Sequence, residues 1–188
     1  MARFTSAELE SYRGAEVPDL LGPDVRLLFV GINPGLWTAA VQTHFARPNN
    51  RFYPALLQAG ILLEQIDAAA GMTDADRAAV LARGIGITNL VRRATARADE
   101  LTAEQLRAGA AALLATVERI RPRVVAVAGI TAYRSAFGVR RAVLGLQPEL
   151  LAGAELWVVP NPSGLNAHET VDSLAEAYAA PARAAGVI

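Results

Sequence analysis

The stretch that decides the fold is Leu27-Leu28-Phe29-Val30-Gly31-Ile32-Asn33-Pro34-Gly35. It begins as a short apolar run, which is typical of a strand buried on both faces. The run ends in a turn, because Gly31 permits backbone angles that a side chain forbids, and Pro34 fixes φ and lacks an amide donor. The turn presents the side-chain amide of Asn33 rigidly at the carboxyl end of a strand, where open α/β sheets bind their ligands.

Further apolar runs alternate with segments of helical spacing along the chain. This alternation predicts an α/β fold: a single domain over 25–188 with a mostly parallel four-stranded sheet flanked by helices, preceded by an N-terminal helix and loop segment over 1–24. The expected strands are 26–31, 84–91, 124–128 and 156–159. The expected helices are 6–12, 50–60, 61–66, 73–83, 102–121, 130–137 and a C-terminal helix that contains Val171, Leu174 and Tyr178.

Helix starts are indicated at Thr73 and, by capping-box spacing, at Thr102–Gln105 and Asn166–Glu169. The stretch 36–48 has no clear period and is predicted to be a loop, long enough to suggest a function. The stretch 138–154 is predicted to be loop or weak strand.

Composition excludes several kinds of chemistry. The chain of 188 residues has no cysteine, two histidines and a formal net charge of zero, and all of its basic residues other than histidine are arginines. Disulfides, thiolate nucleophiles, cysteine-held clusters and lysine Schiff bases are therefore excluded, and a zinc site is not expected. No apolar run is long enough to span a bilayer, and the N-terminus lacks signal-peptide features, so a cytoplasmic protein is expected.

Two predicted strand ends share the order Asn-Pro, at Asn33-Pro34 and at Asn161-Pro162, and a third strand ends at Asn89. Parallel strands end at one edge of a sheet, so these three amides are expected to face one cleft. Asn and Gly also serve turns without any further role, which is the simplest alternative interpretation.

Four ordered motifs resemble the mismatch-specific uracil-DNA glycosylases, the Mug and thymine-DNA glycosylase family. They are Gly-Ile-Asn-Pro-Gly-Leu at 31–36, Phe-Ala-Arg-Pro-Asn-Asn-Arg-Phe at 45–52, Thr-Asn-Leu-Val at 88–91 and Asn-Pro-Ser-Gly-Leu at 161–165. The resemblance spans nearly all of the chain after residue 24. It implies the uracil-DNA glycosylase fold and a DNA repair enzyme that flips uracil, and related lesions opposite guanine, and hydrolyses the N-glycosidic bond to leave an abasic site.

The resemblance also implies roles for individual residues. Asn33 would position the attacking water, since an amide can accept a hydrogen bond from water but is not a real general base. Phe45 would stack on the flipped base, the backbone amides of Ile32 and Phe45 would bind its edge, and Asn89 would help to read it. Asn161 stands where faster relatives carry a histidine, so stabilisation of the leaving base should be weaker. Phe45 as a core aromatic and Asn89 as a turn residue are the alternatives.

The turn Gly164-Leu165-Asn166 resembles the wedge that enters the base stack when a nucleotide flips. Bacterial members of that family carry an arginine where this chain has Ala167, so the resemblance does not extend to the residue that would hold the wedge and contact the opposing guanine. A helix-entry contact is the alternative role for Leu165. The candidate phosphate contacts are Arg47, Arg51, Arg92, Arg93 and Arg97, which could instead form a solvated face.

The resemblance implies a monofunctional glycosylase that needs no metal or other cofactor, acts on DNA containing uracil or mismatches, and is a monomer. Two other functions remain open: a non-catalytic binder of damaged or abasic DNA, and a small-nucleotide enzyme that uses the same cleft. The second lacks a phosphate-cradling Gly-x-Gly-x-x-Gly turn. A hydrolase triad of Ser163, His168 and Asp172 is disfavoured because these residues lie too close together in sequence.

Overall fold

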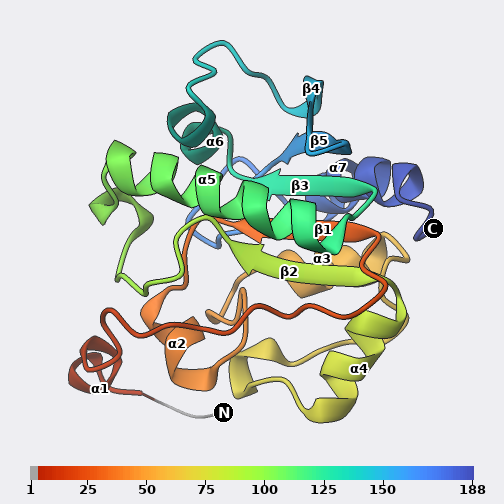
Figure 1. The fold of residues 1–188 in the computed structure, drawn as a ribbon. Helices are drawn as coiled ribbons and strands as arrows, with labels where there is room; N and C mark the ends of the chain where they lie inside the picture. The colour runs from red at the N-terminus through yellow and green to blue at the C-terminus, as the bar shows by residue number, and fades with distance from the viewer. Residues whose placement is uncertain (1–3) are drawn as a thin grey trace.

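The computed structural model describes residues 4–188, which fold around one five-stranded sheet (Figure 1). The strand order is β2-β1-β3-β5-β4, and only β4 runs antiparallel to its neighbour. The prediction of a mostly parallel sheet flanked by helices is confirmed, but the predicted number of four strands was wrong. The strands are β1 (Leu27–Gly31), β2 (Ile85–Asn89), β3 (Val124–Ala128), β4 (Gly145–Leu151) and β5 (Ala154–Val159).

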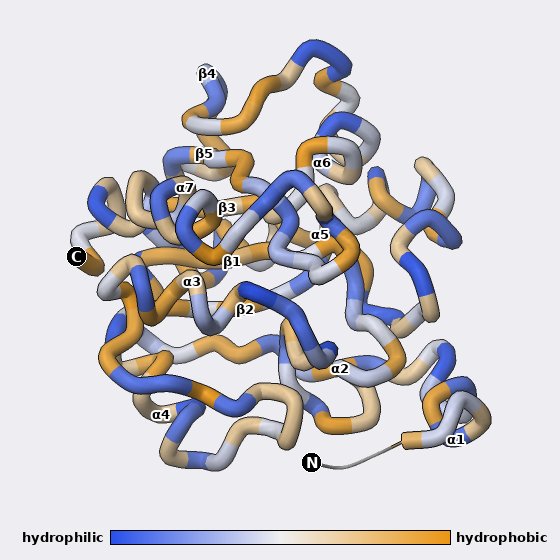
Figure 2. The backbone as a smooth tube through the Cα atoms, turned by 180° about the vertical axis from the view of Figure 1, so that it is seen from behind, coloured by the Kyte–Doolittle hydropathy of each residue, from blue (hydrophilic) through white to orange (hydrophobic). Residues whose placement is uncertain are grey.

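Three adjacent strands of the sheet are completely buried. Every residue of β1, β2 and β3 is buried, as expected for parallel strands that are covered on both faces. Within β1, Leu27 and Phe29 pack into one apolar cluster, whereas Leu28 and Val30 pack into the other, because successive side chains of a strand point to opposite faces. In Figure 2 the strands β1 and β3 lie within the molecule as apolar segments.

Helices cover both faces of the sheet (Figure 1). The cluster on the Phe29 face is formed with α3, α4 and α7, and the cluster on the Leu28 face with α5 and α6. The helices are α1 (Ser6–Glu10), α2 (Leu36–Val41), α3 (Phe52–Gln58), α4 (Asp74–Ala82), α5 (Ala103–Ile120), α6 (Ile130–Phe137) and α7 (Val171–Ala184), with short 3₁₀ turns η1 (Ala68–Ala70) and η2 (Ala98–Glu100).

The local signals at helix starts were partly correct. Capping boxes open α4 at Thr73 and α5 at Thr102, as predicted. The predicted box at Asn166–Glu169 is wrong, since α7 begins one turn later and is capped by Thr170. There the Thr170 hydroxyl accepts from the amide of Ser173 at 3.1 Å.

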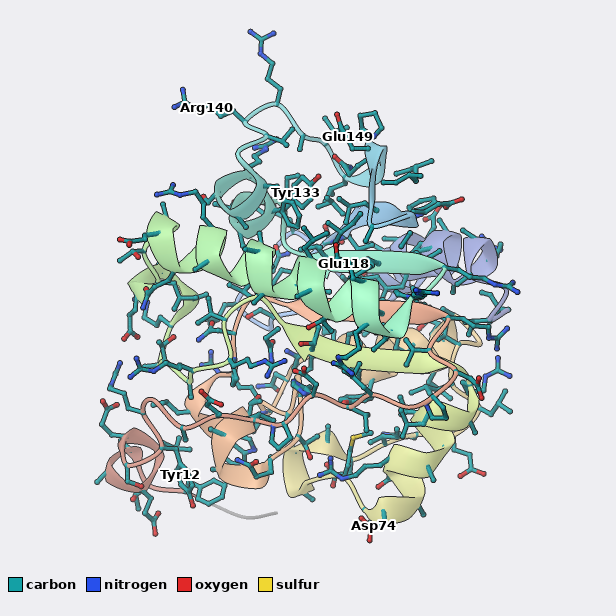
Figure 3. All side chains as sticks on the ribbon, viewed as in Figure 1. Tyr12, Asp74, Glu118, Tyr133, Arg140 and Glu149 are labelled. Carbon is teal, nitrogen blue, oxygen red and sulfur yellow. The ribbon has the colours of Figure 1, made fainter. Side chains whose placement is uncertain are left out.

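Three segments differ from the prediction. The stretch 36–48 contains α2, whose buried residues Thr38 and Ala39 are too small to give an apolar period. The stretch 61–66 is not helical, because Gly60 ends α3 at φ 69° and the apolar residues that follow fill the core from a loop. The strand β4 lies within 138–154 as an antiparallel edge with a bulge; it projects with Glu149 away from the body, as Figure 3 shows.

The N-terminal segment lies along β2. Leu20 and Ile87 exchange backbone hydrogen bonds of 2.9 and 2.8 Å as an isolated antiparallel bridge, and Val17 is buried. This arrangement brings Pro18 and Asp19 close to the carboxyl end of β2. None of the helices in residues 4–188 is long and apolar enough to cross a bilayer.

Candidate functional site

Asn33 lies in the turn that follows β1, half-buried, with its amide nitrogen fixed. Its Nδ2 atom donates to the Thr95 hydroxyl at 2.7 Å, to the Pro34 carbonyl at 3.0 Å and to the Arg93 carbonyl at 3.3 Å. Carbonyl oxygens only accept, so the orientation of the amide follows from its partners. Oδ1 of Asn33 receives no hydrogen bond from residues 4–188, so it is the atom that can accept one from a ligand or water.

Thr95 was not predicted as a site residue. Its hydroxyl accepts from Asn33 and donates to the carbonyl of Arg97 at 2.7 Å, so both of its bonding roles are filled. The Thr95 amide also donates to the Pro34 carbonyl at 3.2 Å, which joins the two loops through the backbone. No local pattern signals this contact, because Thr95 and Asn33 are 62 residues apart in the chain.

Phe45 lies between the core and the Gly31 turn. One face of its ring stacks on Phe52, with ring centroids 4.0 Å apart and planes 23° apart, and its ring atoms Cζ and Cε1 lie 3.1 and 3.4 Å from a Cβ built on Gly31. Phe45 adopts a left-handed backbone with φ 55°, an uncommon conformation for a residue with a side chain and one that often marks functional sites. Phe45 is partly exposed although it packs on the core, so it is not an ordinary fully buried aromatic residue.

The side chains of Asn89 and Phe45 both lie close to the backbone of Gly31. A Cβ atom at this position would lie 2.3 Å from Oδ1 of Asn89 and 3.1 Å from the Phe45 ring. The Asn89 oxygen thus approaches the Gly31 backbone more closely than a side chain at this position would allow, and the Phe45 ring lies close beside it. The parallel register pairs Gly31 with Asn89, which explains why two distant motifs converge here.

The side-chain amide of Asn89 is hydrogen-bonded to the buried His44. Nδ2 of Asn89 lies 3.0 Å from Nδ1 of His44, and Nε2 of His44 lies 3.0 Å from the carbonyl oxygen of Pro18. Burial lowers the pKa of His44, outweighing the Pro18 hydrogen bond and the Asp19 charge that raise it. The imidazole is therefore neutral at physiological pH. Sequence reasoning missed His44, which looks in the chain like an ordinary loop residue.

Asn161 follows β5 with the opposite orientation from Asn33. Its Oδ1 atom accepts from the amide of Ser163 at 3.0 Å. Its Nδ2 atom lies 3.7 Å from the position of a Cβ built on Gly129, and Ile32 lies 3.3 Å from that same position. The donor group of Asn161 thus lies beside the turn that carries Ile32, with no protein acceptor among the described residues.

Two backbone donors complete this edge. The backbone hydrogen bonds recorded for residues 4–188 include none donated by the amides of Ile32 or Phe45. Backbone amides without a protein acceptor can donate to the polar edge of a ligand. The four predicted groups, Asn33, Asn89, Asn161 and Phe45, are all placed at the carboxyl edge of β1, β2 and β5 or in the loop packed against it.

The 161–166 turn is held by Arg51, the residue that precedes α3. Leu165 is 73% exposed at its tip. Nη1 of Arg51 donates to the carbonyls of Ser163 at 3.3 Å and Asn166 at 3.0 Å, and the Arg51 amide donates to Pro162 at 3.0 Å. A Cβ at Gly164 would lie 2.7 Å from the carbonyl oxygen of Asn49, so only glycine fits there.

A family model described as the uracil DNA glycosylase superfamily matches residues 18–181. The chain belongs to this superfamily. Its fold is similar to the solution NMR structure of a Methanosarcina acetivorans protein that is provisionally assigned as a uracil DNA glycosylase. The two share 17% sequence identity at a TM-score of 0.63, over 92% of this chain and 98% of that one. Members of the superfamily are DNA glycosylases.

The predicted arginines of this superfamily member differ in their surroundings. Arg47 and Arg93 are exposed near the site. Arg92 is paired with Asp19, and Arg97 with Asp99. Arg51 donates to two carbonyls of the 161–166 turn, so its predicted phosphate contact competes with a structural role and part of its guanidinium is already used.

Alternative chemistries find little support in the geometry. Within residues 4–188 no group of three or more metal-ligating side chains gathers. Ser163, His168 and Asp172 form no hydrogen bonds with one another among these residues; the Asp172 carboxylate instead accepts from Gln58, and the His168 amide donates to Asn166.

Proposed function

We propose that this protein is a monofunctional DNA glycosylase of the mismatch-specific type, acting on uracil, and on related lesions opposite guanine, in DNA. The observation that carries the proposal is the pair of oppositely oriented amides. Asn33 has its nitrogen fixed and its oxygen free, whereas Asn161 has its oxygen fixed and its nitrogen free. One side chain offers an acceptor for a water, and the other a donor for a base that leaves with negative charge.

Base binding in this proposal uses the edge of the sheet. The flipped base would stack on the free face of Phe45, whose other face is supported by Phe52. The amides of Ile32 and Phe45 would donate to its carbonyl oxygens, and Oδ1 of Asn89 would accept from its ring N–H. Stacking gives a few kcal/mol for any base, so the polar contacts supply the selectivity.

The reaction breaks the bond between the sugar C1′ and the ring N1. The bonding electron pair leaves with the base, and the resulting anion would be stabilised by Nδ2 of Asn161 and by the backbone donors. A water held by Oδ1 of Asn33 then forms a bond to C1′, and its proton passes to solvent because an amide does not hold it. A neutral donor stabilises an anion less than a cationic imidazole would, so the rate should be modest.

No lysine is present to trap the opened sugar as a Schiff base, so strand cleavage by a lysine amine is excluded. The exposed Leu165 would occupy the space that the flipped base leaves in the stack, on a turn held by Arg51. Arg51 thus supplies a brace for the wedge in a chain that has Ala167 where the resembling relatives have arginine.

A multiple-turnover assay separates this function from that of a DNA binder. Duplexes with uracil opposite guanine are incubated with a tenth of an equivalent of protein, and free base and abasic sites are measured. Several equivalents of uracil per protein support the proposal. Tight binding of the duplex with no released base would instead assign the chain as a binder of damaged DNA.

A further inference from the structure

The contact between His44 and Asn89 is buried and has only one consistent set of proton positions. His44 is 4% exposed and Asn89 is 9% exposed. The Pro18 carbonyl can only accept, so Nε2 of His44 carries the proton of the neutral ring. Nδ1 of that ring is then an acceptor, and Asn89 must turn its Nδ2 atom toward it.

This fixes the polarity that Asn89 presents on its other side. With Nδ2 bound to His44, Oδ1 lies over Gly31 beside the Phe45 ring. An amide that was free to rotate by 180° about its terminal bond would present either a donor or an acceptor there. His44 removes that choice, because a reversed Asn89 amide would place its Oδ1 atom against the lone pair of Nδ1 of His44, and two acceptors repel each other.

We propose that His44 is the positioning residue that sets base selectivity, by holding Asn89 with its acceptor toward Gly31 and the Phe45 ring. The proposal rests on the proposed glycosylase function. It selects bases with an N–H at ring position 3, which are uracil and thymine, over cytosine, whose N3 carries a lone pair. Cytosine would then meet acceptor against acceptor, and an unpaired polar contact in such a site is costly.

The charged groups near His44 keep the ring neutral in the working range. Burial lowers its pKa, the Asp19 carboxylate and Pro18 carbonyl raise it, and Arg77 lowers it. Asp19 is itself engaged by Arg92 and by the Thr88 hydroxyl. A protonated ring would donate from both nitrogens, and Asn89 would have to reverse. Selectivity should therefore decline only at acid pH.

The direct test reads the proton on His44 without any activity assay. The His168→Gln variant leaves His44 as the single histidine, and ¹⁵N–¹H correlation spectra at neutral pH report its tautomer. The proposal predicts a proton on Nε2 and none on Nδ1. A proton on Nδ1, or a charged ring, would overturn the proposal whether or not the protein is a glycosylase.

The functional test compares His44→Phe with His44→Gln in single-turnover excision of uracil and cytosine opposite guanine. Phenylalanine removes both hydrogen bonds, so the ratio of uracil to cytosine rates should fall by about tenfold or more. Glutamine can accept from Asn89 and donate to Pro18, so it should keep most of the ratio, and wild-type selectivity should decline at acid pH. His168→Gln is the matched control, with an unchanged ratio expected.

The outcomes separate this proposal from the proposed function. A wild-type protein that excises no uracil contradicts the glycosylase assignment, and the tautomer measurement still tests the polarity of Asn89. A wild type that excises uracil, together with a folded His44→Phe variant that keeps the full ratio, overturns the role of His44. If His44→Phe does not fold, a His44→Gln variant that keeps the ratio at neutral pH and no longer loses it at acid pH supports the proposal. A wild-type ratio that does not decline at acid pH contradicts it.

Discussion

Replacing Thr95 by valine tests whether Asn33 is a positioned group or merely a turn residue. Valine keeps the shape of threonine but removes the hydroxyl that accepts from Nδ2 of Asn33 at 2.7 Å. The remaining acceptors are the Pro34 carbonyl at 3.0 Å and the Arg93 carbonyl at 3.3 Å. The amide should thus keep its orientation but be held less firmly.

The size of the effect on the rate follows from the one lost hydrogen bond to Asn33, whereas the lost bond to the Arg97 carbonyl should affect mainly the melting temperature. A typical net contribution of about 0.5–1.5 kcal/mol corresponds to about a 2- to 13-fold slower chemical step, if the lost bond serves the transition state. Removal of Asn33 itself should cost far more, about 10²–10⁴-fold. Thr95→Val should therefore lie between wild type and Asn33→Ala.

The assay is single-turnover excision of uracil opposite guanine with protein in excess, and melting temperature is measured alongside. Thr95→Ser retains the hydroxyl and should stay near the wild-type rate. In the Asn33→Ala background, Thr95→Val should have no further effect on the rate, because the group it positions is gone. Equal losses for valine and serine, or an additive loss in the double variant, would refute the role of Thr95.

Three further changes probe the rest of the site. Leu165→Ala should slow excision most for uracil paired with adenine and least in single strands, because a wedge matters where a stack must be refilled; an equal loss on all substrates, or a melting temperature lower by several degrees, would assign Leu165 to the fold. Arg47→Ala should reduce the slope of log binding constant against log salt by about one unit, and Arg92→Ala by less because Asp19 already pairs with it; an unchanged slope for Arg47 would make it a solvated residue. Burial lowers the pKa of His44, so as pH falls the unfolded chain takes up a proton before the native one, and the free energy of unfolding declines below the ordinary pKa of histidine. His44→Gln should flatten this acid decline in denaturant titrations. An unchanged decline would contradict this reasoning.

The parts of the fold that were predictable from sequence carry local signals. The strand 124–128 is apolar at every position, and the capping box at Thr102 specifies a helix start from four residues alone. The segment of β4 was predicted only as loop or weak strand and was not counted in the sheet, because its burial does not alternate. Leu146 and Leu150 face solvent, and a bulge shifts the register between them. An edge strand of this kind has no regular period to detect.

In the candidate site, likewise, some features follow from local signals in the sequence and others do not. Asn33, Asn89 and Asn161 were placed at strand ends correctly, because each directly follows an apolar run. Their orientations depend on partners from other segments: Thr95 for Asn33 and His44 for Asn89. A single sequence holds no pattern that links residues so far apart, and the chemistry of an amide depends on which of its two ends is free.

The most direct test of the proposed glycosylase is Asn33→Ala, measured by single-turnover excision of uracil opposite guanine and by equilibrium binding of the same duplex. Removing the water-positioning amide should slow excision by about 10²–10⁴-fold while the dissociation constant for DNA and the melting temperature change little. A variant that excises uracil at the wild-type rate would contradict the assignment of Asn33 and the mechanism built on it.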